Sequence, residues 1–428
     1  MKTLLLFLVC PLFLIAQTQI GQDIDGEAVG DFSGVSVSLS SDGSIIAIGA
    51  YVNDGNGDAS GHVRVYKNEN ETWTKIGQDI DGETAGDVSG IRISLSSDGS
   101  VVAVGAPAND DNGNSSGHVR IYKNENEIWT QIGQDIDGET ANQETGRSLS
   151  LSSDGSIIAI GSVGFYGYNS VSIYKNENET WTQIGTDIDG EALNDDSGIS
   201  VSLSSDGSII AIGARFNTFS GNQEGYVRIY KNENNTWSQI GNNIYGEANF
   251  DYSGISVSLS SDGSIIAIGA PGNDDNGTDS GHVRVYKNVN GTWIQIGNDI
   301  DGEATFDNSG ISVSLSLDGS IVAIGAYNNN GNGTDSGHVR VYDLSALLST
   351  ESFNVDYFSY FPNPVKDVLN LNLNPGLDLK QVNLYNSLGQ YLYSTNTTTI
   401  NTSNLNSGLY FIEVETDQGK STKKIIKK

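Results

Sequence analysis

Alternating apolar and small polar residues recur along most of the chain, each time followed by a short and almost wholly apolar run. In residues 254–260 every second position is apolar, which is the two-residue period of a β-strand. An Asp-Gly pair then supplies a tight turn, and residues 265–270 are apolar enough to be buried on both faces. Polar loops separate two further runs at 281–286 and 292–296. The pattern predicts four antiparallel strands per unit and no helix.

This unit recurs six times, and an Ile-Gly pair at its end marks each copy. The isoleucines are Ile20, Ile76, Ile132, Ile184, Ile240 and Ile296. Their successive differences are 56, 56, 52, 56 and 56 residues, so the third unit is four residues short. Four strands in about 50 residues, repeated, are typical of the blades of a β-propeller.

The two ends of the repeat array predict closure into a ring. Five units begin their fourth strand with a tryptophan: Trp73, Trp129, Trp181, Trp237 and Trp293. The sixth unit stops at residues 341–343 after its third strand, and residues 17–21 resemble the missing fourth strand. We therefore predict an all-β fold, a six-bladed β-propeller over residues 17–343. Its N-terminal strand would complete the last blade and cover the open edge.

The unit resembles FG-GAP repeats, which form the blades of integrin-α-type propellers and of many bacterial surface proteins. The matching motifs are Ser-Gly-Ile-Ser-Val before the first strand, Gly-Ala-Pro after the second and Gly-x-Val-x-Val-Tyr in the third. Two features depart from the family. Ser-Gly replaces Phe-Gly, or Thr145-Gly146 in the third unit, and the calcium loop between the first two strands is reduced to Ser-Asp-Gly. The family's calcium site is therefore not expected here.

Residues 1–16 have the pattern of a secretory signal peptide. Lys2 supplies the positive charge, residues 4–15 the apolar core, and Ala16 the small residue before the cleavage point. The core is too short to span a membrane, and we expect no transmembrane segment. Cys10 lies inside this core and is the only cysteine, so the mature protein is expected to contain no disulfide.

The charge changes after the repeats. Residues 353–428 hold seven Lys/Arg and six Asp/Glu, a net charge of +1, while the whole chain carries −31. Residues 1–352 therefore carry −32, which disfavours nucleic acid and anionic lipid as partners and favours cations. We predict a linker at residues 344–352 and a separate domain over residues 353–428.

The last domain contains four strand-like runs, which predict a small immunoglobulin-like β-sandwich. Its motifs are Phe-Pro-Asn-Pro at 361–364, Leu-Tyr-Asn-Ser-Leu-Gly-Gln at 384–390, Ser-Gly-Leu-Tyr at 407–410 and a basic end at 423–428. The domain closely resembles the type A C-terminal sorting domain of the Bacteroidetes type IX secretion system. The resemblance implies that residues 353–428 engage that secretion machinery. It also implies a secreted or outer-membrane surface location. The alternative is an ordinary immunoglobulin-like module.

Most carboxylates fall in the loops that join strands two to three and four to one, which share one face of an up-and-down blade. Candidate calcium ligands are Asp79, Asp81 and Glu83 in one loop and Asp274, Asp275 and Asp279 in another. Spaced side-chain oxygens beside a glycine suit calcium, the one cofactor that the sequence suggests. Ordinary solvated turns account for the same residues, because Asn, Asp and Gly dominate turns.

Repeat symmetry breaks in units three and four. The acidic loop of unit three is replaced by an aromatic stretch, and the equivalent loop of unit four also carries aromatic residues. The resulting candidate ligand-binding residues are Phe165, Tyr166, Tyr168, Arg215, Phe216, Phe219 and Glu224. Exposed aromatic rings beside polar groups often mark binding sites. The alternative is that these rings pack together over the shortened loop.

Four histidines occupy one repeat position, at the start of the third strand: His62, His118, His282 and His338. Copies in separate blades are too far apart to converge on a metal, so we expect a packing or hydrogen-bonding role. The arginine two residues later is expected to pair with carboxylates. No serine, cysteine or glutamate stands out beside a base and an orienting group, so we do not expect an enzyme.

The sequence as a whole predicts an exported adhesion or binding module that recognises a glycan or a surface protein through its loop face. Two alternatives remain open. One is a polysaccharide lyase or hydrolase on a propeller scaffold, which would need a distinct pair of carboxylates. The other is a structural component of a surface layer.

Overall fold

The structure is a computed structural model. It describes residues 19–164, 169–217, 223–331, 333–348, 358–374, 377–387, 390–416 and 419–428. The predicted signal peptide at residues 1–16 lies outside these ranges. The chain divides after Leu348 into two compact units. Strands dominate both units, and the single helix of the described residues is α1 (Ser345–Leu348).

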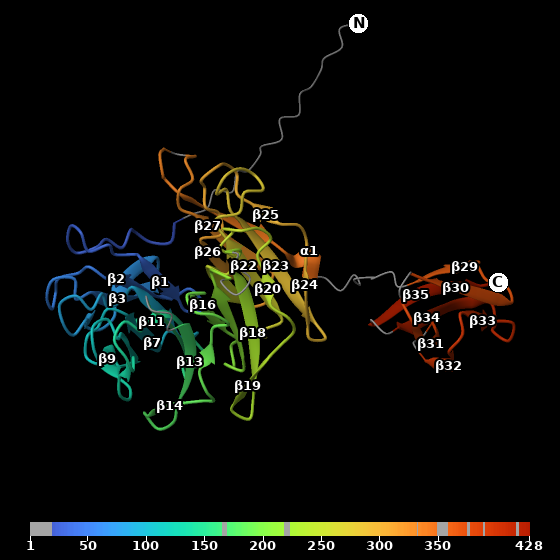
Figure 1. Cartoon of the computed structure of the whole chain (residues 1–428), viewed down its shortest axis with the longest axis horizontal. Helices are drawn as coiled ribbons and strands as arrows, with labels where there is room; N and C mark the ends of the chain where they lie inside the picture. The colour runs from blue at the N-terminus through green and yellow to red at the C-terminus, as the bar shows by residue number, and fades with distance from the viewer. Residues whose placement is uncertain are drawn as a thin grey trace, which may run out of the picture. The chain divides into compact units, whose positions relative to one another are not determined.

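The first unit is a series of six antiparallel sheets, one for each sequence repeat (Figure 1). Sheet one contains β1 (Ser36–Leu39), β2 (Ile45–Ala50), β3 (His62–Glu69), β4 (Thr72–Lys75) and β5 (Ile80–Asp81). Sheet two contains β6 (Arg92–Leu95), β7 (Val101–Ala106), β8 (His118–Glu125), β9 (Ile128–Gln131) and β10 (Ile136–Asp137). Sheet three contains β11 (Thr145–Leu151), β12 (Ile157–Val163), β13 (Asn169–Asn176), β14 (Trp181–Gln183) and β15 (Ile188–Asp189).

The remaining three sheets repeat this order. Sheet four contains β16 (Ser197–Leu203), β17 (Ile209–Ala214), β18 (Tyr226–Glu233), β19 (Thr236–Gln239) and β20 (Ile244–Tyr245). Sheet five contains β21 (Ser256–Leu259), β22 (Ile265–Ala270), β23 (His282–Val289), β24 (Thr292–Gln295) and β25 (Ile300–Asp301). Sheet six contains β26 (Ser312–Leu315), β27 (Ile321–Ala326) and β28 (His338–Asp343).

The fourth strand of each complete sheet is broken into two pieces that pair with the same third strand. In sheet one, β4 pairs with the far half of β3, and β5 pairs with its first two residues. Gly77 lies between the pieces with a φ of +78°, and a Cβ there would come within 2.7 Å of the Trp129 ring. The break therefore follows from the close approach of the next sheet's tryptophan, which only glycine permits at this φ.

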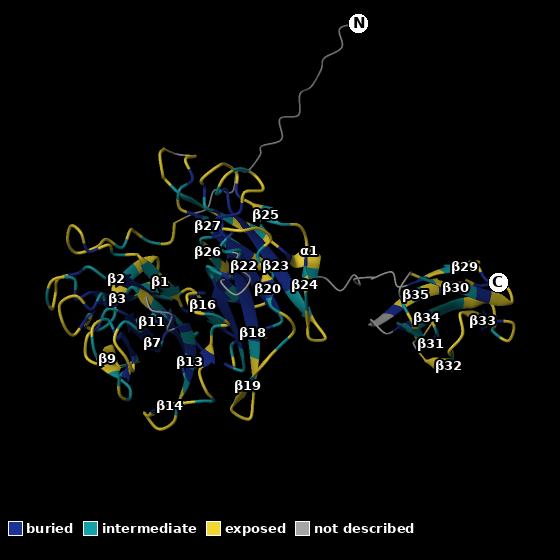
Figure 2. Cartoon of the chain, in the orientation of Figure 1, coloured by how far each residue is buried: buried dark blue, intermediate teal, exposed yellow. Residues whose placement is uncertain are grey.

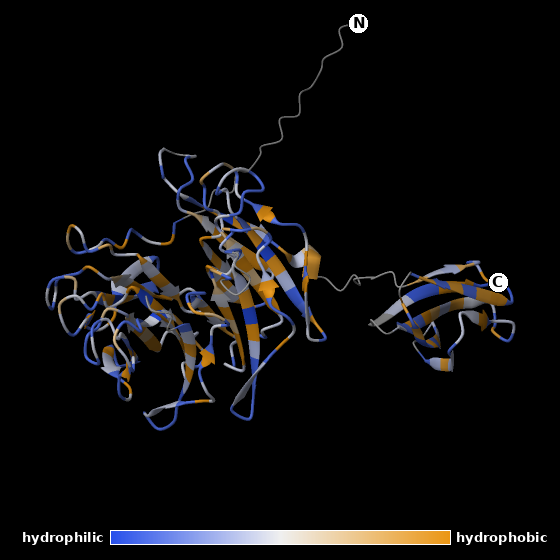
Figure 3. Cartoon of the chain, in the orientation of Figure 1, coloured by the Kyte–Doolittle hydropathy of each residue, from blue (hydrophilic) through white to orange (hydrophobic). Residues whose placement is uncertain are grey.

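Successive sheets pack face to face through five apolar clusters (Figures 2 and 3). Between sheets one and two, Val63 and Val65 meet Val102 and Trp129. Trp129 is 3% exposed, and its indole Nε1 donates a hydrogen bond to the Ile76 carbonyl at 3.0 Å. Trp129, Trp181, Trp237 and Trp293 each hydrogen-bond to the preceding sheet and pack in or against an apolar cluster.

The two end sheets leave apolar faces in solvent. Val339 and Val341 on β28 are 67% and 65% exposed, and Val37 on β1 is 60% exposed. In sheet two, Val119 and Ile121 occupy the positions of Val339 and Val341 and are fully buried. Exposure at the ends therefore arises from the lack of a neighbouring sheet, since the same residue types are buried in the middle of the series.

The predicted closing strand is not formed in the structure. Among the described residues β28 pairs with β27 alone, and residues 19–21 form no strand; residues 17 and 18 lie outside the described ranges. The N-terminal segment instead lies against sheet one, where the Trp73 Nε1 donates to the Ile20 carbonyl at 2.9 Å. The N-terminal segment thus contacts sheet one without pairing with a strand of sheet six.

The end of the first unit differs from the predicted linker. Leu344 is buried among residues of sheets five and six, and Leu348 of α1 packs against the same cluster. Residues 344–348 therefore belong to the repeat unit, because their apolar side chains are part of its core. The predicted domain boundary at residue 343 was placed too early.

The second unit consists of two antiparallel sheets. One contains β29 (Phe358–Phe361), β30 (Val368–Leu373) and β33 (Thr399–Asn401). The other contains β31 (Leu379–Asn386), β32 (Tyr391–Thr395), β34 (Gly408–Thr416) and β35 (Gly419–Lys427). Residues of both sheets, including Phe358, Leu371, Val382 and Ile412, share one buried apolar core. The immunoglobulin-like topology within this class of fold stays a prediction.

Candidate functional site

The loops before the third strand and after the fourth strand contact each other, as the up-and-down pattern predicts. The Ser89 amide donates to the Ser60 carbonyl at 3.0 Å, and the Gly82 amide donates to the Gly61 carbonyl at 2.8 Å. The side chain of Asn112 reaches the Gly138 carbonyl at 3.0 Å. One face of the repeat unit is therefore a continuous band of hydrogen-bonded loops, and the candidate residues lie on it.

Arg215 and Phe216 stand directly after β17, on this loop face. The Arg215 Nε donates to an oxygen of Asp196 at 2.5 Å, and its guanidinium carbon lies 4.9 Å from the centre of the Phe216 ring. Phe216 in turn meets Tyr252 edge to face at 5.8 Å. A cation held over one aromatic ring and beside a second ring forms a preorganised surface with both apolar and polar character.

These residues line a hollow of about 490 Å³ between units four, five and six. Ile255 and Ile311 supply apolar walls, and Asp279 and Tyr327 add polar groups. Its volume falls in the range of small-ligand sites. The mixture of flat rings, aliphatic walls and a few charged groups suits a ligand with an apolar face and polar edges.

Unit four departs from its neighbours at this position. The residues that correspond to Arg215 in the other units are Tyr51, Pro107, Val163, Pro271 and Tyr327. Arg215 is therefore the charged member of a set whose other members are uncharged, and its charge is held by Asp196. Sequence reasoning found Arg215 and Phe216 but missed Asp196 and Tyr252, because these come from loops of the same and the following unit.

The other predicted ligand-binding residues are placed differently. Glu224 accepts a hydrogen bond from the Asn217 side chain at 2.8 Å, within its own loop. Arg215 has its ion pair with Asp196 instead. The predicted aromatic residues Phe165, Tyr166, Tyr168 and Phe219 lie outside the described residues.

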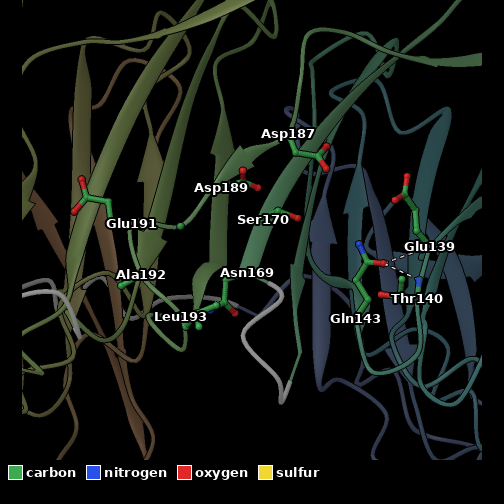
Figure 4. A pocket seen from close by; sticks show the side chains of 11 residues that line it. Glu139, Thr140, Gln143, Asn169, Ser170, Asp187, Asp189, Glu191, Ala192 and Leu193 are labelled. Carbon is green, nitrogen blue, oxygen red and sulfur yellow. Dashed lines mark hydrogen bonds between the residues drawn. The ribbon is translucent and has the colours of Figure 1, made fainter.

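A second hollow, of about 630 Å³, lies on the same face beside sheet three (Figure 4). The carboxylates that line it belong to Glu139, Asp187, Asp189 and Glu191. Sheet three differs from sheet two at the two positions that hold a histidine and an arginine, since Ser170 and Ser172 replace His118 and Arg120. The Ser172 hydroxyl donates to Asp187 at 2.7 Å. Loss of both large side chains widens this part of the band and leaves it acidic.

Four of the five repeat arginines pair with a glutamate in the loop that leads into their own sheet, as predicted, whereas Arg228 donates to the Asp189 carbonyl and the Ser197 hydroxyl. Arg64 lies 3.2 Å from Glu27, Arg120 lies 3.3 Å from Glu83, and Arg284 lies 3.3 Å from Glu247. These pairs connect adjacent sheets along the loop face. Because the glutamates remain partly exposed, each pair is expected to contribute little to stability by itself.

Beside each pair lies a buried histidine. His118 and His282 are 1% and 0% exposed, and burial lowers the pKa of both imidazoles, with the adjacent arginines acting in the same direction. The ring nitrogens face carboxylates: the Nδ1 of His118 lies 3.9 Å from Glu83. Each of these imidazoles is therefore neutral and is surrounded by carboxylates. Their oxygens lie farther from the ring nitrogens than a hydrogen bond allows.

Three of the predicted calcium ligands lie in separate groups of side chains. Asp79 lies with His62 and Glu27, whereas Glu83 lies with Asp111 and His118 on the next sheet. Asp275 lies with Glu247, His282 and Asp299. Asp274 accepts a hydrogen bond from the Asp279 amide at 2.8 Å, and the Asp81 carbonyl accepts one from Arg120 at 2.9 Å. Neighbours in sequence thus belong to different groups in space.

Comparison with known protein families finds matches in two segments of the chain. Residues 359–428 match the family described as "Secretion system C-terminal sorting domain", and residues 246–286 match the FG-GAP repeat. No curated protein matches the chain significantly. The chain thus carries an FG-GAP repeat and a type IX sorting domain, as the sequence motifs indicated.

Solved structures support the class of the fold. Hydrazine synthase of Kuenenia stuttgartiensis is 13% identical with a TM-score of 0.52, over 78% of this chain and 85% of its own. A protein of Bacteroides uniformis, proposed to be a 6-phosphogluconolactonase, is 13% identical with a TM-score of 0.50, over 72% of this chain and 80% of its own. At this identity the likeness concerns the fold alone, which is propeller-like.

The sorting domain defines the destination of the protein. A chain with this domain is recognised by the secretion machinery and is a secreted or outer-membrane surface protein. Within the described residues, no helix has the length and apolar character needed to cross a membrane.

Proposed function

We propose that the repeat unit is an exported binding module whose ligand is a glycan, held in the hollow beside Arg215 and Phe216. The observation that carries this proposal is the guanidinium of Arg215, paired with Asp196 and stacked on the Phe216 ring. Sugar rings present an apolar face that packs on aromatic side chains and hydroxyl groups that bond to charged edges. An adhesion role follows from the surface location of the protein.

A screen with purified full-length chain tests this function. A glycan array is probed with the wild type, with Arg215→Ala and with Phe216→Ala. Phe306→Ala is the matched control, because Phe306 is 54% exposed at the position of unit six that corresponds to Phe250 and does not line the hollow. We expect retention of one or more glycans by the wild type and the control, and loss by the other two variants.

The alternatives predicted from the sequence appear as other results of the same screen. Release of shorter saccharides from a retained polysaccharide would indicate an enzyme. Failure of the wild type to retain any glycan would overturn the proposed ligand, and a surface protein or a structural role would then be the remaining interpretations. A melting curve for each variant distinguishes a lost site from a lost fold.

We also infer that the repeat unit closes into a six-bladed ring. Support comes from residues 19–27, whose contacts with sheet one repeat those of residues 75–83 with sheet two. Trp73 donates to the Ile20 carbonyl as Trp129 donates to that of Ile76. Arg64 likewise bonds to the Asp25 carbonyl and pairs with Glu27. The segment thus holds the position of an outer strand from a preceding sheet.

Among the described residues, sheet six has no outer strand of this kind. Valines on β28 are exposed, and so are Val37 and Leu39 on β1. Side chains of these types pack against each other between all the other neighbouring sheets. Contact between these two faces would remove several large apolar side chains from water, each contributing about 1.5–3 kcal/mol when fully buried. Closure would also pair the free edge of β28 with the N-terminal segment.

A further inference from the structure

Three buried histidines on the loop face, His62, His118 and His282, lie beside carboxylates from separate loops. Of these three, only the groups of His118 and His282 include an aspartate from the loop before the histidine. In unit five, His282 begins β23, Asp275 lies in the loop before it, and Asp299 lies between β24 and β25. Glu247 lies in the loop that joins sheet four to sheet five. One possible ligand atom of each of these four residues lies within 4.8 Å of the others. The Nδ1 of His282 is 3.7 Å from an oxygen of Asp299.

The histidine in this group has no partner for its ring. Both nitrogens of His282 are buried and without a hydrogen-bond partner among the described residues, and the residue is 0% exposed. A buried polar atom without a partner is unfavourable, and such atoms are rare in folded proteins. A cation between the imidazole and the carboxylates would satisfy the Nδ1 and would offset the negative charge around it.

Unit two contains a similar arrangement, in which Asp135 lies with His118 in a group separate from Glu83 and Asp111. Glu83, Asp111 and His118 form one group, and both ring nitrogens of His118 are again buried without a partner. The corresponding residues of the two units are separated by one interval: 247 − 83, 275 − 111, 282 − 118 and 299 − 135 all equal 164. Arg120 and Arg284 each contact one oxygen of a glutamate and fix its position. The other oxygen of Glu83 lies 3.9 Å from the Nδ1 of His118.

We propose that these two groups are binding sites for a divalent transition-metal ion of the zinc class. Imidazole nitrogen with carboxylate oxygens is the donor set that such ions accept at three or four positions. Calcium, by contrast, takes six to eight oxygens and does not favour an imidazole nitrogen. Each ion would connect two adjacent sheets, since its glutamate lies in the loop that follows the last strand of the preceding sheet.

The other units provide natural comparisons, because each lacks one member of the donor set. Units three and four have Ser170 and Tyr226 in place of the histidine. Units one and six have Gly55 and Gly331 in place of the aspartate that precedes the histidine by seven residues. His338 of unit six is therefore a matched control: it faces Glu303 at 3.7 Å but lacks the second loop carboxylate. Substitution of this residue is expected to leave zinc binding unchanged.

The test measures bound metal in the full-length chain, purified without a polyhistidine tag, stripped with chelator and dialysed against zinc. The wild type is expected to retain two zinc ions per chain by elemental analysis. His118→Gln and His282→Gln are expected to retain one each, the double variant none, and His338→Gln two. Cobalt in place of zinc should give visible absorption in the wild type that the double variant lacks.

Several results would overturn the proposal. They are a wild type that retains less than one zinc ion, a double variant that retains two, and equal losses from His338→Gln. If the wild type and the double variant bound no zinc and retained calcium equally, the carboxylates alone would be the ligands and the histidines would have no role in binding. Circular dichroism confirms that each variant is folded, and the position itself tolerates change, since serine and tyrosine occupy it in sheets three and four.

Discussion

Substitution of two tryptophans by phenylalanine, one at a time, tests how the sheets meet. Trp129→Phe removes an indole N–H whose acceptor is the Ile76 carbonyl, between sheets one and two. A buried acceptor without its donor costs about 1–3 kcal/mol. The smaller ring buries roughly 40 Å² less apolar surface, worth about 1 kcal/mol. The free energy of unfolding should therefore fall by about 2–4 kcal/mol.

Thermal unfolding followed by circular dichroism measures this change. An unfolding entropy of about 2.1 cal/mol/K per residue gives ~0.7 kcal/mol/K for a unit of roughly 330 residues. The expected decrease in Tm for Trp129→Phe is then about 3–6 °C. A decrease below 1 °C would refute the packing that the structure assigns to this tryptophan.

Trp73→Phe distinguishes a closed ring from an open series. In the structure Trp73 is half-buried, as are Trp237 and Trp293, and its hydrogen bond to Ile20 is exposed. With sheet six packed against sheet one, Trp73 would contact a preceding sheet as the other tryptophans do, and both variants should lose about 3–6 °C. A loss of only about 1 °C for Trp73→Phe, beside a full loss for Trp129→Phe, would refute ring closure.

Three further predictions concern pH, export and the repeat core. Hydrogen bonds from the Ser44 amide and from the Ser40 and Ser44 hydroxyls lower the pKa of Asp42 from 3.8 to about 2, so its contribution to stability is present above pH 3.8 and disappears as pH falls to about 2. Asp42→Asn should therefore reduce the pH dependence of Tm in this range. Deletion of residues 353–428 should leave the repeat unit inside the cell envelope, which fractionation and immunoblotting would detect. Leu344→Ala should lower the unfolding free energy by about 2–4 kcal/mol in chemical denaturation, because the side chain is buried between sheets five and six.

The strands were predictable from the sequence because alternation and repetition give the same answer six times. Ile265–Ala270, for example, was expected to be buried on both faces, and β22 is buried throughout. The broken fourth strand was not predictable, since its second piece has two residues and the break depends on a tryptophan of the next sheet. The end of the repeat unit was missed because the sequence does not show that Leu344 is buried against sheets five and six.

The candidate site was only partly predictable. Departures from repeat symmetry identified Arg215 and Phe216, but their contacts Asp196 and Tyr252 lie on other loops. The histidine groups were missed because the copies were compared with one another rather than with carboxylates at fixed intervals. A signal was present: the sequence keeps a glutamate 35 residues before and an aspartate seven residues before both His118 and His282.

The most direct test of the proposed function is an affinity measurement at the hollow beside Arg215. Isothermal titration calorimetry with the glycan that the wild type retains compares the wild type with Phe216→Ala and Phe306→Ala. Loss of one stacked ring should weaken binding by at least tenfold, which is about 1.4 kcal/mol, whereas the control should stay within about twofold of the wild type. Equal affinities of the wild type and Phe216→Ala, with unchanged melting curves, would contradict the assignment of the binding site to this hollow.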